Sequence, residues 1–184
     1  MFDDKYKFTC VDRFLKYVKY DTQSDEDSTS FPSSEKQKVL SKDLAEELKK
    51  MGLKDAHMDE HGYVMATLPS NSSKNVPPIG FIAHVDTSPA VSGANVNPVI
   101  HKNYKGGDIK LPKDASQVIL ESENPDLKNM KGYDIITTDG TTLLGADNKS
   151  GVAEIMDAVN YWLSHPEAKH GTIKICFTPD EEVG

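Results

Sequence analysis

A short apolar run in the middle of the chain restricts the fold more than any other feature. Residues 79–83 read Ile-Gly-Phe-Ile-Ala, and a loop rich in Ser, Asn and Pro precedes them. A run this short suits a strand that is covered on both faces, as in parallel sheets. Such strands belong to sheets flanked by helices, so the run predicts an α/β fold.

Helical and strand-like patterns alternate along the rest of the chain, in agreement with this class. Apolar residues recur at helical spacing in three segments, 8–18, 39–51 and 152–163. Two further segments have strand patterns, 63–68 and 172–178. We therefore predict a central, mostly parallel or mixed sheet flanked by helices.

Three local signals refine this prediction. Ser34 and Gln37 have the spacing of a capping box, which would begin the second helix, and Gly52 would end it. Asp139-Gly140 lies between two short apolar segments and predicts a hairpin of residues 135–138 and 141–144. Residues 89–134 have weak periodicity, and we place no elements there.

Charge and hydropathy exclude several classes of function. The chain has 21 Lys and Arg against 29 Asp and Glu, a formal net charge of −8, whereas nucleic-acid binders carry a basic excess. No apolar signal segment and no run of 18 apolar residues is present, so we expect a cytoplasmic protein without a membrane partner. The two cysteines, Cys10 and Cys176, lie in apolar stretches and are expected to be free thiols.

One histidine-rich segment resembles a metal motif but is expected to be a surface hairpin. His57 and His61 have the spacing of an inverted zinc-protease motif, which requires a helix. Gly62 and a strand pattern follow at once. In a strand, residues four apart lie about 13 Å from one another, too far to share an ion.

Three polar motifs come directly after strand-like segments: His84-Val85-Asp86, Asp147, and Glu181-Glu182. Ligands of open α/β sheets collect beyond the carboxyl ends of the strands. The sequence therefore predicts that the three motifs form one shared site.

Each spacing suits metal-assisted hydrolysis. In an extended segment His84 and Asp86 point the same way, so His84 could bind zinc while Asp86 fixes its tautomer. Asp147, just before a helix, could bridge two ions about 3.5–4 Å apart. Glu181 and Glu182 would face opposite directions in extended backbone, so one could bind metal while the other takes a proton from water.

Structural interpretations of these motifs stay open at this point. An isolated His-x-Asp is weak evidence. Gly-Ala-Asp-Asn before a helix also suits an N-cap, and Pro-Asp-Glu-Glu suits the acidic first turn of a helix. Spacing alone does not decide between these roles and a metal site.

Several longer segments, however, resemble the peptidase T family, the tripeptide aminopeptidases among the M20 di-zinc peptidases. They are residues 79–89, 95–98, 103–109, 137–151 and 177–184. The His-Val-Asp-Thr and Gly-Ala-Asp motifs are typical of M20 enzymes in general, whereas residues 103–109 and 177–184 indicate peptidase T. The resemblance implies cytosolic removal of the N-terminal residue from a tripeptide, with two zinc ions.

The resemblance also implies a role for each site residue. His84 and Glu182 would each bind one zinc ion, and Asp147 would bridge both. Asp86 would support His84, and Glu181 would be the general base that activates water. Asn148 stands where the family commonly has aspartate, at a position that is not a ligand.

Family members continue well past the Glu-Glu motif, with a further aspartate ligand, a distal histidine ligand and a lid domain used in dimerisation and substrate binding. Without these, each zinc would have two protein ligands, where catalytic zinc usually has three. We expect residues 1–184 to be the N-terminal part of one catalytic domain, with no second domain. The isolated chain would be inactive and would need the C-terminal part of the same enzyme; an oligomer would require the lid domain.

Two alternatives remain open. The chain could be part of another M20 amidohydrolase, a dipeptidase or an N-acyl amino acid deacylase, although residues 103–109 argue mildly against this. It could also be a non-catalytic fragment that binds metal or peptide. The complete set of acid, base and bridging motifs argues against that.

Overall fold

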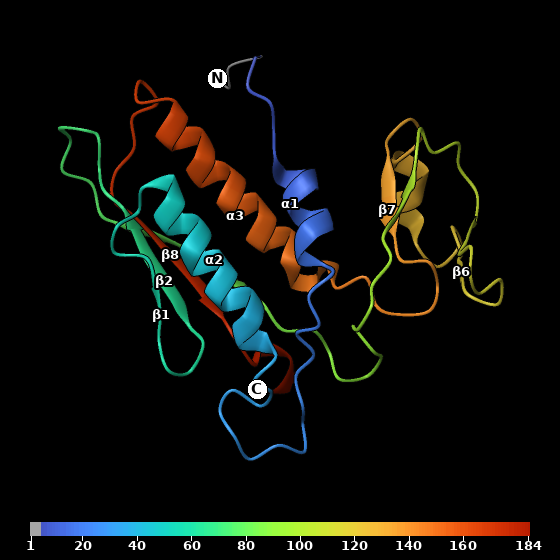
Figure 1. The fold of residues 1–184 in the computed structure, drawn as a ribbon. Helices are drawn as coiled ribbons and strands as arrows, with labels where there is room; N and C mark the ends of the chain where they lie inside the picture. Colours follow the sequence, from blue (N-terminus) through green and yellow to red (C-terminus); the bar gives the residue numbers. More distant parts are fainter. Residues whose placement is uncertain (1–4) are drawn as a thin grey trace.

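The computed structural model describes residues 5–184 and shows a four-stranded sheet, here called the main sheet (Figure 1). Its strands, in spatial order, are β1 (His57–Met58), β2 (Val64–Leu68), β8 (Ile173–Thr178) and β3 (Ile79–His84). β2 pairs antiparallel with β1 and with β8, whereas β3 pairs parallel with β8. The predicted α/β class with a mixed sheet is confirmed.

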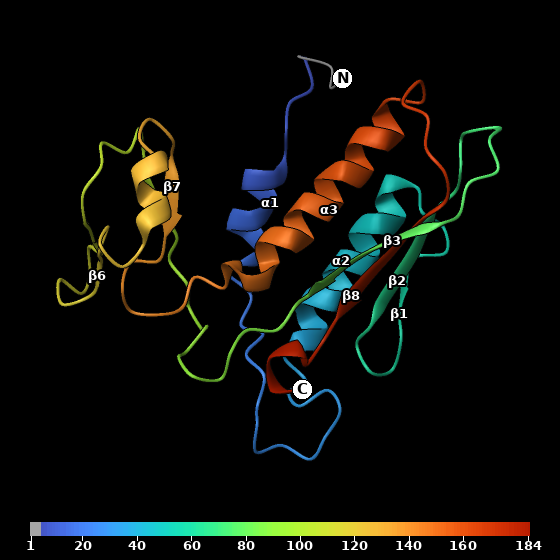
Figure 2. The ribbon, with the colours of Figure 1, turned by 180° about the vertical axis from the view of Figure 1, so that it is seen from behind.

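Helices gather on one face of the main sheet, as the front and back views show (Figures 1 and 2). They are α1 (Cys10–Tyr17), α2 (Gln37–Met51) and α3 (Ala146–Ser164). Alternate residues of β2 and β8 point to this face and are buried, among them Val64, Ile175 and Phe177. They pack in one apolar cluster with Leu44 of α2 and Met156 of α3. Burial of each large side chain contributes about 1.5–3 kcal/mol, so this cluster stabilises the sheet and its helices together.

Strand β3 lies at the edge of the main sheet, and the prediction that it is covered on both faces is wrong for these residues. Ile79, Phe81 and Ile82 are 52%, 36% and 68% exposed, and only Ala83 and His84 are buried. An apolar run shows that a strand is suited to burial, but it does not show whether both of its faces are covered.

Residues 95–143 form a smaller unit beside the helices, here called the side lobe. It holds β4 (Val99–His101) paired antiparallel with β7 (Ile135–Thr137), and β5 (Ile109–Lys110) paired antiparallel with β6 (Val118–Ile119). A short 3₁₀ helix, η1, spans Pro125–Asn129.

The predicted hairpin around Asp139-Gly140 is wrong, because β7 pairs with β4 and residues 141–144 form no strand. The Asp139 carboxylate instead closes a turn. It accepts hydrogen bonds from the N–H and hydroxyl of Thr141, at 3.1 and 2.6 Å, and from Asn97 Nδ2 at 3.0 Å. The structure therefore has a turn that is stabilised by a buried side chain, where the sequence predicted a hairpin stabilised by strand pairing.

The start of α2 also differs from the prediction. Lys36 is the N-cap and makes no side-chain cap, so the capping box is absent. The Ser34 hydroxyl donates to the Gln23 carbonyl instead, at 2.6 Å. Gly52 ends the helix at φ 110°, as predicted. His57 and His61 lie on the predicted β1–β2 hairpin and form no helix. None of the helices within residues 5–184 is both long and apolar enough to cross a bilayer.

Candidate active site at the ends of β3 and β8

The parallel pairing of β3 and β8 brings the two strand ends to the same edge of the main sheet. His84, the last residue of β3, is in register with Thr178, the last residue of β8. The turn after β8 leads into a 3₁₀ helix, η2 (Glu181–Val183). Asp147 comes from the first turn of α3, where Asp147 and Asn148 have non-helical backbone angles and are joined by a cis peptide bond. Three distant segments therefore meet at one place.

Two carboxylates lie around one nitrogen of His84. Its Nε2 atom is 2.9 Å from Asp147 Oδ1 and 3.7 Å from Glu181 Oε2. The His84 side chain is 6% exposed, whereas those of Asp147 and Glu181 are 86% and 63% exposed. The imidazole is thus fixed in the protein, and the carboxylates face solvent.

Asp86 connects His84 to the turn that carries the two glutamates. Its carboxylate is fully buried, and Oδ1 lies 3.3 Å from His84 Nδ1. The same carboxylate accepts hydrogen bonds from the backbone N–H groups of Glu181 at 3.1 Å and Glu182 at 3.0 Å. A single buried side chain thereby sets the position of β3's last residue relative to η2.

The glutamates themselves lie in η2 and not in extended backbone, which corrects the prediction for residues 181–182. In a 3₁₀ helix successive side chains diverge by about 120°, so the two carboxylates still point in different directions. Glu181 directs its carboxylate toward His84. The Asp86 hydrogen bonds to consecutive N–H groups favour this tight turn over an extended segment.

The electrostatics of the site reflect crowded carboxylates around one imidazole. Burial lowers the pKa of His84, but its hydrogen bonds to Asp86 and Asp147 outweigh burial and raise the pKa to about 9. Burial raises the pKa of Asp86, but bonds from His84, Glu182 and Glu181 hold it below its usual value. Burial also raises the pKa of Glu182; His84 opposes this, and the charges of the neighbouring carboxylates add to it. Positive charge is favoured at this place.

The histidine and carboxylate side chains are the potential metal donors of this site. An imidazole nitrogen and carboxylate oxygens are the donors that zinc takes in hydrolases. Across residues 5–184, no group of three or more His, Cys, Asp or Glu side chains is arranged to hold a metal ion. His84 and Asp147 provide two donors next to each other, one fewer than a catalytic zinc ion usually has from protein.

Sequence reasoning missed two buried charged residues beside the site. Lys149, in α3, is 1% exposed, and its ammonium donates to the Tyr20 carbonyl at 2.8 Å. Burial lowers the pKa of Lys149 to about 8. Asp180 precedes the glutamates and is 9% exposed. The sequence signal for Lys149 was its place among the buried positions of a helical pattern, and Asp180 had no such signal. The partners of both residues are far away in sequence.

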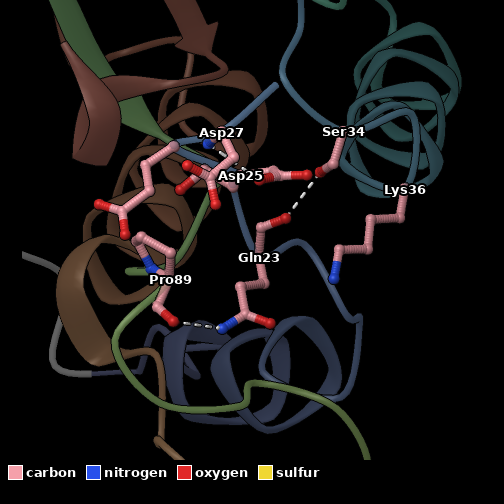
Figure 3. Close-up of a pocket in the computed structure, with 8 residues that line it drawn as sticks. Gln23, Asp25, Asp27, Ser34, Lys36 and Pro89 are labelled. Carbon is pink, nitrogen blue, oxygen red and sulfur yellow. Dashed lines mark hydrogen bonds between the residues drawn. The ribbon is translucent and has the colours of Figure 1, made fainter. Parts of the chain in front are cut away.

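A cavity of about 340 Å³ lies between the loop of residues 21–36 and the segment that follows Asp86 (Figure 3). Gln23 joins the two walls, since its amide donates to the carbonyls of Ser88 at 3.3 Å and Pro89 at 3.1 Å. Asp25, Glu26 and Asp27 line the cavity together with Lys36. The space is therefore polar and mainly acidic.

Comparison with known proteins finds relatives that match part of their length to this chain. No family model matches the chain. Peptidase T of Bacillus pumilus is 55% identical over 174 residues, which is 95% of this chain and 42% of that protein. Peptidase T of Clostridium acetobutylicum is 58% identical over 174 residues, 95% of this chain and 43% of that protein. The chain thus spans less than half the length of these relatives.

Solved structures share the fold. An aminopeptidase from Bacillus cereus has a TM-score of 0.61 at 24% identity, and a tripeptidase from Staphylococcus aureus has a TM-score of 0.62 at 23% identity. The match covers 95% of this chain and 37% of each of those chains. Aminoacylhistidine dipeptidase from Vibrio alginolyticus has a TM-score of 0.59 at 21% identity, with 28% of its chain covered. Over 95% of its own length, this chain is therefore similar to less than half of peptidase T, and it has the fold of part of these solved peptidases.

Proposed function

We propose that this chain is part of a zinc-dependent tripeptide aminopeptidase that releases the N-terminal residue of its substrate. The observation that carries the proposal is the contact of buried Asp86 with both His84 and the Glu181–Glu182 turn, beside Asp147. Together with the 2.9 Å contact of His84 Nε2 with Asp147 Oδ1, this brings the three motifs close to one another. The peptidase T homologues supply the reaction and the substrate class.

His84 and Asp147 would hold one zinc ion, and Asp147 and Glu182 would hold the other. Bound zinc would lower the pKa of a water molecule and polarise the peptide carbonyl. Binding at His84 Nε2 requires loss of the proton on that nitrogen, so metal uptake releases a proton. Asp86 keeps the remaining proton on Nδ1 and fixes the ring orientation.

Glu181 would act as the general base. Its carboxylate is 63% exposed, 3.7 Å from His84, and it keeps a free oxygen to accept a proton from the attacking water. The same oxygen would then deliver the proton to the amine that leaves. Glu182, whose pKa is raised by burial and neighbouring carboxylates, is suited to a cation partner.

The remaining ligands would come from outside these residues. The relatives are matched over 42% and 43% of their length, which leaves room for further ligands and a lid. We propose that residues 1–184 form the N-terminal part of one catalytic domain, completed by its C-terminal part, and that the enzyme acts in the cytoplasm. Any oligomer would depend on the lid.

The alternative of another amidohydrolase has one specific observation in its favour. An aminoacylhistidine dipeptidase shares the fold at a TM-score of 0.59. The same strand-end residues would then act on a dipeptide or an N-acyl amino acid. The non-catalytic alternative has the incomplete donor set of residues 5–184 in its favour.

The test uses the natural gene product that contains these residues, supplied with zinc. We expect tripeptides to be cleaved faster than dipeptides and N-acyl amino acids, and Glu181→Gln to lower kcat by about 10²- to 10⁴-fold. Glu60→Gln, the same change on the exposed β1–β2 hairpin, is the matched control and should keep the wild-type rate.

A Glu181→Gln protein with the wild-type rate would contradict the assignment of the base. Preference for dipeptides or acyl amino acids would favour the amidohydrolase alternative. The 184-residue chain by itself is expected to bind zinc weakly and to show negligible turnover. Two tightly bound zinc ions in a calorimetric titration of that chain would contradict the need for further ligands.

A further inference from the structure

The turn before the glutamates has an unusual backbone. Asp180 has φ 57° and ψ 28°, the left-handed conformation that non-glycine residues rarely adopt. It is also 9% exposed, so its carboxylate is largely removed from water. Such a residue persists only where its surroundings determine both its backbone and its side chain. The contacts of Asp180 therefore control where Glu181 and Glu182 are placed.

Those contacts come from the segment that begins α2. The Asp180 carboxylate accepts hydrogen bonds from Ser33 N at 2.7 Å, Ser33 Oγ at 2.5 Å and Gln37 Nε2 at 2.6 Å. In return, the Asp180 N–H donates to Gln37 Oε1 at 3.1 Å. Gln37 thus binds the main chain and the side chain of the same residue. Ser33, Gln37 and Asp180 are here called the Asp180 network.

The network is anchored in the main core. Gln37 is the first residue of α2 and is fully buried, and Leu40 and Leu44 on the same helix pack in the apolar cluster. A rigid, packed helix is a precise support for a site, because its side chains have little freedom to move. The position of the Asp180 turn is therefore set by α2.

Two buried carboxylates fix the turn from two sides. Asp86, after β3, accepts the N–H groups of Glu181 and Glu182. Asp180, one residue earlier, is held by Ser33 and Gln37. The glutamates thus lie between a contact to the sheet and a contact to α2. Without the contact to α2, only Asp86 would restrain the turn. The turn could then rotate about its hydrogen bonds to Asp86.

We propose that Gln37, together with Ser33, is a positioning residue that fixes Glu181 and Glu182 relative to His84. Its effect on catalysis rests on the proposed function, whereas its effect on the turn does not. A misplacement of about 1 Å at a reacting group can lower the rate by about 10²-fold. Loss of the Gln37 amide should therefore act on kcat, while substrate binding elsewhere stays intact.

The test compares Gln37→Leu and Ser33→Ala with Ser41→Ala in the natural gene product. Ser41 lies one turn further along α2, is fully buried, and its hydroxyl has no hydrogen-bond partner in the described part of the chain. Two quantities are measured: tripeptide kcat and KM with saturating zinc, and hydrogen exchange of the Glu181 and Glu182 amides.

We expect Gln37→Leu to lower kcat at least about tenfold with KM changed less than about twofold, and to speed exchange at both glutamate amides by a similar factor. Ser33→Ala should act in the same direction to a smaller extent, because the Ser33 N–H remains. Ser41→Ala should leave kcat and exchange at the wild-type values.

Unchanged exchange and kcat in Gln37→Leu would overturn the proposal, and so would an equal loss in Ser41→Ala, which would indicate general repacking of α2. If Gln37→Leu does not fold, Ser33→Ala decides by the same two measurements. If the wild-type protein cleaves no tripeptide, the proposed function fails, and the exchange rates at Glu181 and Glu182 still decide the positioning role.

Discussion

The main sheet and the side lobe are stabilised in different ways. The main sheet and its helices share one large cluster of buried apolar residues. The side lobe has only three buried apolar residues in its own cluster, Tyr104, Ile109 and Leu111. Apolar burial thus stabilises the main sheet and its helices, whereas the side lobe depends on side chains that bind backbone groups.

In the side lobe, carboxylate side chains accept backbone N–H groups at several turns. Asp134 accepts the Asn103 N–H at 2.9 Å and pairs with Lys102 at 2.6 Å. Glu121 accepts the Gly107 N–H at 2.6 Å. Such local contacts determine turns but give little cooperative stability. This contrast agrees with the position of the candidate site, which lies at strand ends of the packed region, where geometry is kept best.

The largest expected effect is in the main core. Phe177→Ala removes a fully buried ring from β8 and should lower the free energy of unfolding by about 3–5 kcal/mol. Chemical denaturation followed by far-UV circular dichroism measures this loss. Tyr133→Ala, at a 65% exposed ring of the side lobe, is the control and should change stability little. Equal losses in the two variants would contradict the distinction between the regions.

A smaller and local effect is expected from Asp139→Asn. The Asp139 carboxylate is 1% exposed and also lies 3.1 Å from Lys113 Nζ. The substitution should speed amide exchange several-fold in residues 97–141 and leave β8 unchanged, because one of the two acceptor oxygens is replaced by an NH₂ donor and the negative charge is lost. Exchange followed by mass spectrometry locates the change. Faster exchange in β8 as well would show that the lobe and the main sheet unfold together.

The same carboxylate predicts a pH dependence. Hydrogen bonds from Thr141, then from Asn97 and Lys113, hold the pKa of Asp139 well below its usual value. The folded pKa is thus lower than the unfolded one, so this stabilisation is complete above the usual pKa of about 3.9 and is lost as the pH falls below it. In the wild type, protection of the side-lobe amides from hydrogen exchange should decrease in acid. In Asp139→Asn the decrease should be smaller. Protection that increases in acid would contradict the assignment.

The smallest effect is expected at the free edge of the main sheet. Ile82→Thr changes a side chain that is 68% exposed and should alter the free energy of unfolding by less than about 0.5 kcal/mol. Thermal unfolding of the 184-residue chain measures it. A loss comparable to that of Phe177→Ala would show that another polypeptide segment or a second copy covers β3 in solution.

The sequence predicted the main sheet and its helices better than the side lobe. Strands near 63–68 and 172–178 and the three helices were predicted correctly, because periodicity records which side of an element is buried. His84, Asp147 and Glu181 were expected together because each was predicted to follow a strand. Asp147 instead lies in the first turn of α3, but its Oδ1 is still 2.9 Å from His84 Nε2, and Glu181 Oε2 is 3.7 Å from the same atom. Their catalytic roles stay predictions.

The side lobe was unpredictable for a physical reason. Its strands have two or three residues each, too few to show a period. Asp139-Gly140 resembled a hairpin turn, because the same residue types serve turns of several kinds. Pairing between β4 and β7 joins residues 34 to 38 positions apart, and no local signal specifies such a partner.

The sequence by itself determined the α/β class, the main helices and strands, and the chemical types gathered at the strand ends, because these depend on periodicity and on order along the chain. Only the tertiary structure decided that β3 is an edge strand, that Asp86 binds the backbone of the glutamate turn, and that Ser33 and Gln37 hold Asp180. These contacts join residues 95 to 147 positions apart, and a polar side chain does not indicate in sequence which distant group will satisfy it.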